Sequence, residues 1–72
     1  MTDTERLNEI IDASGYKRSF IAKQVGLSPF GLANKINNVY EFKTGEINAL
    51  CALLGIDSLE DKEAIFFKVS PR

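Results

Sequence analysis

Histidine and tryptophan are absent from this 72-residue sequence, and cysteine occurs once, as Cys51. A lone cysteine cannot form a disulfide within the chain, and without histidine it cannot complete a zinc cluster. Cys51 lies in a hydrophobic helical pattern, which favours a buried, unreactive thiol over a nucleophile. The sequence also has no phosphate-binding glycine loop and no pair of carboxylates on an apolar face. We therefore expect a protein that is not an enzyme and uses no metal or other cofactor.

Long hydrophobic runs are missing as well. No apolar stretch approaches the roughly 20 residues that cross a bilayer, and the acidic start, MTDTERLNE, is unlike a signal peptide. We therefore expect a cytoplasmic protein with no membrane contact and no small-molecule substrate. The hydrophobic fraction of 44% is ordinary for a globular chain. The length predicts a single domain over residues 1–69, with residues 70–72 as a frayed tail.

Charge is unevenly distributed, although the net charge is only −1. The segment 15–45 holds five basic residues and one acidic residue, a net charge of +4. These are Lys17, Arg18, Lys23, Lys35 and Lys43, against Glu41. The two flanks hold four basic and nine acidic residues, a net charge of −5. A basic centre favours nucleic-acid contact, and ordinary solvated lysines are the alternative.

Apolar spacing predicts a first helix that ends at Gly15. Thr2 and Glu5 fit a capping box at its start, and the inner face is Leu7, Ile10, Ile11 and Ser14. A second, short helix buries Phe20, Ile21 and Val25.

The next segment predicts a tight turn and a third helix. Gly26 supplies the turn, Leu27 fills the corner between the helices, and Ser28 caps a helix that opens with Pro29. Leu32 and Ile36 point inward at i and i+4. The opposite face then holds Phe30, Asn34 and Asn37, with Pro29 and Ala33 at its edge. A shift of the helix start by one residue would instead bury Phe30, which is the alternative.

The rest of the chain predicts a fourth helix and a short fifth one. Thr44 caps the fourth helix, Ile47, Leu50, Cys51 and Leu54 face inward, and Gly55 ends it. Phe42, in the loop before it, is expected to anchor in the core. Ser58 and Asp61 form a capping box for a helix over 59–64. Residues 65–69 have strand-like composition. Phe66 and Phe67 either fold back onto the bundle or pack against a second subunit. The expected fold is all-α, a compact bundle of four to five short helices containing a helix-turn-helix, with an extended C-terminal tail.

The span from Gly15 to Ile56 resembles the Cro/repressor (XRE-type) helix-turn-helix family of bacteria and phages. The resemblance is carried by FIAKQVGLS (residues 20–28), Leu32, Ile36 and the helix end at residues 50–56. The wider pattern is most similar to small regulators of temperate phages, either Cro-like proteins or antirepressors that modulate repression. The resemblance implies a transcription regulator in the bacterial host cell, active in a lysis/lysogeny-type switch.

By position, the resemblance makes residues 28–38 the recognition helix in the DNA major groove. The expected DNA-binding or partner-binding residues are Pro29, Phe30, Ala33, Asn34 and Asn37. The expected phosphate contacts are Lys17, Arg18, Lys23, Lys35, Asn38 and Lys43.

Two mechanisms stay open at this point. In the first, the chain binds operator DNA, with Asn34 on an adenine edge and Phe30 on a thymine methyl group. In the second, the face of Phe30, Asn34 and Asn37 docks on a phage repressor, because an exposed aromatic is a suitable anchor for a protein partner. We expect DNA binding, repressor binding or both, with autonomous operator binding alone as the alternative. A homodimer is a further open alternative.

Overall fold

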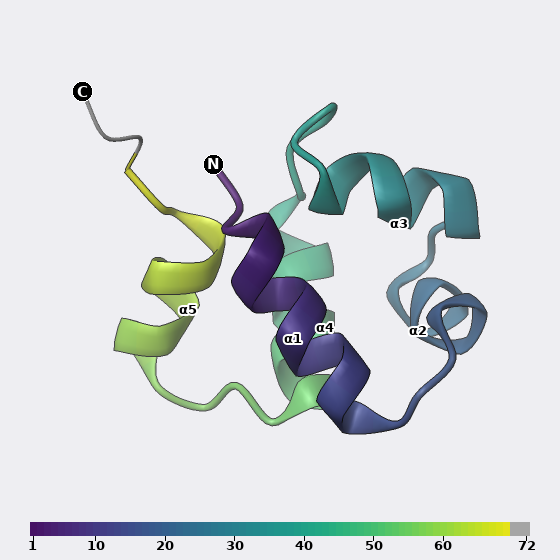
Figure 1. Ribbon diagram of the computed structural model, residues 1–72, viewed down its shortest axis with the longest axis horizontal. Coiled ribbons are helices and arrows are strands. Elements are labelled where there is room, and N and C mark those ends of the chain that lie inside the picture. The colour runs from purple at the N-terminus through teal and green to yellow at the C-terminus, as the bar shows by residue number, and fades with distance from the viewer. Residues whose placement is uncertain (70–72) are drawn as a thin grey trace.

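Short helices account for most of the chain in the computed structural model, which describes residues 1–69 (Figure 1). They are α1 (Thr4–Ser14), α2 (Arg18–Val25), α3 (Pro29–Ile36), α4 (Thr44–Leu54) and α5 (Leu59–Phe66). The described residues contain these five helices and no strand. The predicted all-α class is therefore confirmed. The predicted frayed tail, residues 70–72, lies outside the described residues.

Three helices end at the glycines that were predicted to end them. α1 ends at Gly15, α2 at Gly26 and α4 at Gly55. The turn after α2 needs its glycine, because Gly26 has a φ of +84°. A side chain in this left-handed conformation costs about 1–2 kcal/mol. The Leu27 N–H then donates to the Ala22 carbonyl at 2.8 Å and closes the turn.

The starts of α3 and α5 also follow the prediction. Ser28 Oγ accepts a hydrogen bond from the Gly31 N–H at 2.9 Å, and Pro29 opens the helix. Ser58 Oγ accepts from the Asp61 N–H at 3.0 Å, but the Asp61 carboxylate bonds to Arg6, so only the serine half of the predicted capping box forms. Each serine satisfies one of the amide groups that have no partner in the first turn of a helix.

The predicted caps of α1 and α4 are wrong by one residue. The cap of α1 is Asp3, whose carboxylate accepts from the Arg6 N–H, and not Thr2. Thr2 is buried and hydrogen-bonded elsewhere, which places it outside the helix. At α4 the capping position is Lys43 and Thr44 is already helical. Glu46 reaches back to accept the Lys43 N–H at 2.9 Å, which ties the start of the helix to the residue before it.

The core lies between all five helices. α2 packs against α3 and α4, and α1 packs against α3, α4 and α5. Each fully buried leucine or isoleucine stabilises the fold by about 1.5–3 kcal/mol. Cys51 belongs to this core, and burial raises the pKa of its thiol, which agrees with the predicted unreactive role. The buried members are Leu7, Ile11, Ile21, Ala22, Leu32, Ile36, Ile47, Leu50, Cys51, Ile65 and Phe66.

The strand-like prediction for residues 65–69 is wrong at its start, because α5 continues to Phe66. Ile65 and Phe66 are both buried, and the Phe66 ring packs edge-on against Phe42 with centroids 5.6 Å apart. Of the two alternatives, Phe66 therefore folds back onto the bundle, and Phe42 anchors as predicted. Phe67 is exposed. Packing against α1 and Phe42 outweighs the β-preference of the segment.

Phe20 was predicted to lie on the buried face of α2, and this is wrong. It is 41% exposed and packs against Tyr16, with ring centroids 5.2 Å apart. The buried residues of α2 are Ile21 and Ala22, with Val25 partly buried. Phe20 precedes Ile21 by one residue, which is about 100° around the helix, so it points away from the side of α2 that Ile21 and Val25 share. Ser14, predicted on the inner face of α1, is half-buried.

Candidate functional site

The orientation of α3 is fixed by its inner face. Leu32 and Ile36 are almost completely buried, 1% and 2% exposed, and lie one helical turn apart. The three-residue connection Gly26–Ser28 joins α3 to α2, and Leu27 packs partly buried against the core. Burial on one side and a short connection at one end leave the opposite side of α3 facing outward.

Phe30 is the main feature of this outward side, because 77% of it is exposed. The alternative in which Phe30 belongs to the core is therefore excluded. Pro29, Ala33 and Asn37 are also exposed, and Asn34 is half-buried. The structure thus brings together the five residues that were predicted to bind DNA or a partner.

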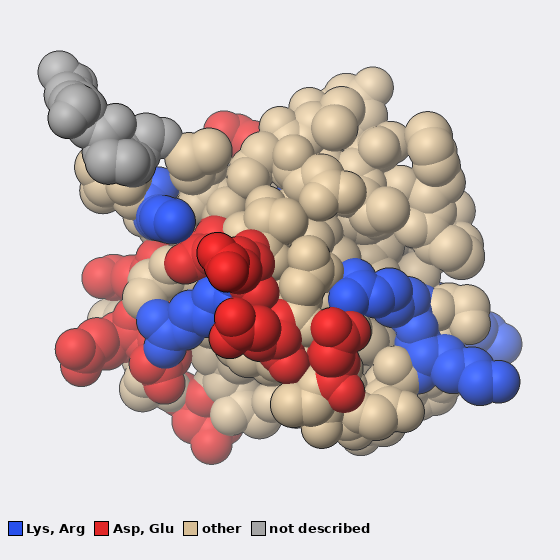
Figure 2. All heavy atoms as spheres, in the orientation of Figure 1, with Lys and Arg blue, Asp and Glu red and all other residues tan. Residues whose placement is uncertain are grey.

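A neighbouring loop extends this outward side, which sequence reasoning missed. Val39 is 60% exposed and Tyr40 is 63% exposed. Their N–H groups donate to the Asn34 carbonyl at 2.8 and 3.5 Å, so the loop folds back on α3. Figure 2 shows only uncharged atoms over α3 and the tip of this loop. The available signal was the apolar pair Val39–Tyr40 directly after the Asn37–Asn38 helix end.

Lys35 lies on α3 but is directed to α4. Its Nζ atom is 2.6 Å from Glu46 Oε1, and both side chains are only 13% exposed. Burial by itself would raise the pKa of Glu46. The hydrogen bonds from Lys35 and from the Lys43 N–H, together with the charges of these lysines, outweigh that effect and lower the pKa. The predicted phosphate contact Lys35 is therefore engaged in a partly buried ion pair.

Arg18 is also engaged with other side chains. It donates to Asn8 Oδ1 at 2.9 Å and to Asp12 Oδ1 at 3.0 Å, which joins the start of α2 to α1. Such an exposed ion pair contributes roughly 0–1 kcal/mol and opens readily. Among the predicted phosphate contacts, Lys17, Lys23 and Lys43 are exposed. Figure 2 shows basic side chains gathered over α2 and acidic ones over α1 and α5.

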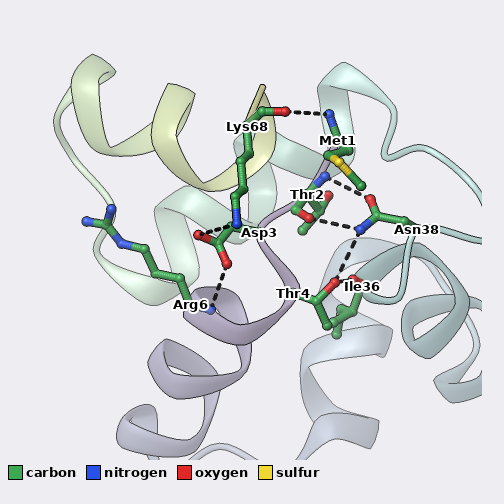
Figure 3. A network of polar contacts seen from close by, with 8 residues as sticks. All are labelled: Met1, Thr2, Asp3, Thr4, Arg6, Ile36, Asn38 and Lys68. Carbon is green, nitrogen blue, oxygen red and sulfur yellow. Dashed lines mark hydrogen bonds and ion pairs between the residues drawn. The ribbon is translucent and has the colours of Figure 1, made fainter. Parts of the chain in front are cut away.

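The N-terminal segment, residues 1–3, connects α5 with the end of α3 (Figure 3). The Lys68 N–H donates to the Met1 carbonyl at 2.8 Å, and the Asp3 N–H donates to the Ile65 carbonyl at 2.6 Å. Lys68 Nζ also lies 3.7 Å from an Asp3 carboxylate oxygen. These bonds hold the segment along the C-terminal end of α5.

Asn38 binds the other side of this segment. Its Oδ1 accepts from the Thr2 N–H at 2.8 Å, and its Nδ2 donates to the Thr2 carbonyl at 2.9 Å and to Thr4 Oγ1 at 3.2 Å. Thr4 Oγ1 in turn donates to the Ile36 carbonyl at 2.6 Å. Asn38 has a φ of +64°, a conformation that asparagine tolerates better than most residues. The predicted phosphate contact Asn38 is thus bonded to the N-terminal segment through both ends of its amide.

A groove of about 440 Å³ lies between α4 and α5 and contains none of the predicted site residues. Its lining is Thr44, Ile47, Leu59, Lys62, Glu63 and Phe67. Within residues 1–69, no three His, Cys, Asp or Glu side chains are grouped so that they could bind a metal ion. Over the same residues, every helix is too short or too polar to cross a membrane.

Comparisons with known proteins give no match, so a function has to be argued from the geometry of this chain. No family model, no curated protein and no solved structure matches the chain.

Proposed function

We propose that this chain is a transcription regulator of the helix-turn-helix type that acts in a phage lysis/lysogeny-type switch, in the bacterial cytoplasm. The outward side of α3 is its binding surface, and the main partner of that surface is a repressor protein. The observation that carries the proposal is Phe30, which is 77% exposed on a helix whose inner face is fixed in the core. An aromatic side chain held in solvent on a rigid helix is a typical anchor of a protein interface.

The distribution of charge supports a protein partner as the main contact. Lys35, the one basic residue of α3, is paired with Glu46 on α4. A helix that enters a DNA groove gains much of its affinity from contacts between basic side chains and DNA phosphates. The outward residues of α3 include no basic side chain for such contacts, whereas an apolar anchor gains its binding energy from burial in a partner.

Operator DNA is the second candidate, and a specific observation favours it. Lys17, Lys23 and Lys43 are exposed near the two ends of α2 and the start of α4. They suit phosphate contacts that position the protein while Asn34 and Phe30 reach the base edges. The two mechanisms are compatible, because a weak DNA contact can be strengthened within a complex with a repressor.

The test is to mix the chain with the cognate phage repressor and to measure complex formation by analytical size exclusion. A complex is expected, and Phe30→Ala should weaken it about tenfold or more. Leu59→Ala is the matched control, because Leu59 is a similarly exposed apolar residue on α5. An undiminished complex with Phe30→Ala would show that α3 is not the contact face.

Electrophoretic mobility shifts with operator DNA at several salt concentrations test the second candidate, because they measure how the DNA affinity depends on salt. Phosphate contacts predict an affinity that falls steeply as salt increases. A chain that shifts no operator fragment even at low salt and forms no repressor complex would refute the proposed function as a whole.

A further inference from the structure

The outward sides of α1 and α2 carry opposite charges. On α1, the exposed residues Glu5, Glu9 and Asp12 have the spacing i, i+4, i+7, so they lie along one side of the helix. At the start and near the end of α2, Lys17 and Lys23 are exposed. No acidic residue occurs from position 13 to position 40. An acidic stripe on α1 is thus followed in the chain by a basic stripe on α2.

The two stripes belong to one continuous face. The connection from α1 to α2 has only three residues, 15–17. Arg18, the first residue of α2, reaches back to α1, and its Nη2 atom lies 3.0 Å from Asp12 Oδ1. Figure 2 shows the acidic side chains over α1 and the basic ones over α2 in a single view. We call this the α1–α2 face. Its acidic half is Glu5 and Glu9, and its basic half is Lys17 and Lys23.

Most charges of this face have no partner of opposite sign within the fold. Asp12 and Arg18 neutralise each other. Over the described residues, by contrast, no ion pair includes a residue of the acidic half or of the basic half. The fields of both halves therefore act on the surroundings, over a distance of about 8–10 Å at moderate salt.

An exposed aromatic pair lies where the two halves meet. Tyr16 is in the connection after α1, and Phe20 is in the first turn of α2. Their ring centroids are 5.2 Å apart, and the two residues are 43% and 41% exposed. Protein interfaces typically combine aromatic side chains at the centre with a polar, charged rim. The aromatic pair therefore adds an apolar contact to a face whose charges set the orientation.

The order of the charges selects the occupant of the face. A nucleic acid or an acidic protein suits the basic half, but the acidic half beside it repels such a partner. A basic partner is repelled by the basic half in the same way. A second copy of the chain carries both signs. With a two-fold axis between the halves, the acidic half of each copy meets the basic half of the other, and every charge contact occurs twice.

We propose that the α1–α2 face binds a second copy of the chain in a two-fold symmetric dimer, with the aromatic pair close to the axis. This inference goes beyond the proposed function, because it does not depend on what α3 contacts. Exposed ion pairs contribute only about 0–1 kcal/mol each, so the dimer is weak and dissociates as salt increases. The dimer covers Lys17 and Lys23, so it and a DNA contact through these lysines exclude each other.

Charge reversal followed by mixing tests the dimer. The acid-reversed variant combines Glu5→Lys with Glu9→Lys, and the base-reversed variant combines Lys17→Glu with Lys23→Glu. Sedimentation equilibrium at about 0.05 M and about 0.5 M salt gives the dimer dissociation constant of each. Circular dichroism melting checks that each variant is folded.

The natural chain should dimerise at low salt and dissociate at high salt. Each reversed variant alone should dimerise about tenfold more weakly or worse, because like charges then meet in both contacts. An equimolar mixture of the two variants should regain the dimer, since one copy has a wholly basic face and the other a wholly acidic one. This rescue separates a lost contact from a damaged fold.

A control variant separates the face from net charge. Glu41→Lys combined with Glu63→Lys changes the net charge as much as the acid-reversed variant does, at exposed positions outside the face. This control should dimerise within about threefold of the natural chain. It should not restore a dimer when mixed with the base-reversed variant, because its acidic half still meets like charge.

Other results overturn the inference. A natural chain that stays monomeric at every protein and salt concentration has no such dimer; loss of operator binding in the base-reversed variant would then assign the basic half to nucleic acid. A dimer that both reversals leave unchanged uses another surface. A mixture of the reversed variants that stays monomeric shows that the two halves do not meet. None of these results bears on the repressor complex of α3, which is measured separately.

Discussion

Asn38 gives the most direct test of how the loop after α3 is held against the N-terminal segment. Asn38→Gly removes the amide but keeps a residue that adopts a φ of +64° without strain. The substitution breaks three hydrogen bonds, at 2.8 and 2.9 Å to the Thr2 backbone and at 3.2 Å to Thr4 Oγ1. A typical internal hydrogen bond contributes about 0.5–1.5 kcal/mol net. Asn38 is exposed, so water can replace part of these bonds, and we expect a loss of about 1–3 kcal/mol.

The glycine itself also lowers stability through the unfolded chain, by roughly 0.5–1 kcal/mol. Asn37→Gly is the matched control for that effect, because it places the same residue one position earlier. The Asn37 side chain makes no hydrogen bond within the described residues, and only its backbone N–H is bonded, to Ala33. The difference between the two variants gives a lower limit for the contribution of the Asn38 amide, because glycine also relieves the left-handed backbone at position 38 and not at position 37.

Urea unfolding followed by circular dichroism gives both free energies of unfolding. Thermal melting should show the same order, with about 4–8 °C for each kcal/mol in a domain of this size. Hydrogen exchange adds a local measurement: the Thr2 N–H, which donates to Asn38 Oδ1, should exchange faster in Asn38→Gly. If Asn38→Gly unfolds within about 0.5 kcal/mol of Asn37→Gly and the Thr2 N–H exchanges at the same rate in both, the Asn38 amide does not hold the N-terminal segment.

Three further predictions concern charge, turn geometry and the separation of surface from core. The pKa of Glu46 lies below its ordinary value of 4.5, so its stabilising effect is complete above that pH and is lost as the pH falls through the lower folded pKa. Glu46→Gln should therefore lose stability at pH 7 and show a shallower acid decline, which urea midpoints between pH 7 and pH 2 would measure. Gly26→Ala should lower the free energy of unfolding by about 1–2 kcal/mol, because Gly26 has a left-handed φ. Gly45→Ala is the control: Gly45 lies in the first turn of α4 with open space around it, so the substitution should be neutral or slightly stabilising. Equal melting temperatures for the two variants would contradict this prediction. Phe30→Ala should change the free energy of unfolding by less than about 0.5 kcal/mol, whereas the buried Phe66→Ala should lose about 3–5 kcal/mol, and a large loss at Phe30 would mean that its ring packs in the core.

The parts of the fold that the sequence predicts are those set by neighbours within one or two helical turns. Leu32 and Ile36 lie four residues apart and do face the core. Gly26 ends α2 because the required backbone conformation is a property of one residue. Ser28 caps α3 through a bond that spans three residues. Periodicity and capping chemistry are local, so a single sequence contains enough information to place them.

The parts that could not be predicted depend on residues far apart in the chain. Ile65 and Phe66 have strand-like composition, and only packing against Phe42 and α1 makes them helical. Asn38 bonds to Thr2 across 36 positions, and no pattern in the sequence connects them. In the same way Lys35 is a candidate phosphate contact by spacing alone, until Glu46 is found beside it. The positions of the candidate site were predictable, but which of them are already occupied by intramolecular bonds was not.

The residues of α3 that stabilise the fold are different from those on its outward side, so the outward side can be substituted without loss of the fold. Leu32 and Ile36 bind α3 to the core, and Lys35 binds it to α4 through Glu46. Phe30, in contrast, is 77% exposed and contributes little buried surface to the fold. Substitutions at Phe30 are therefore limited by what it contacts outside the molecule and not by stability. An exposed aromatic on a helix that the core holds in place is the observation that supports the proposed contact with a partner protein.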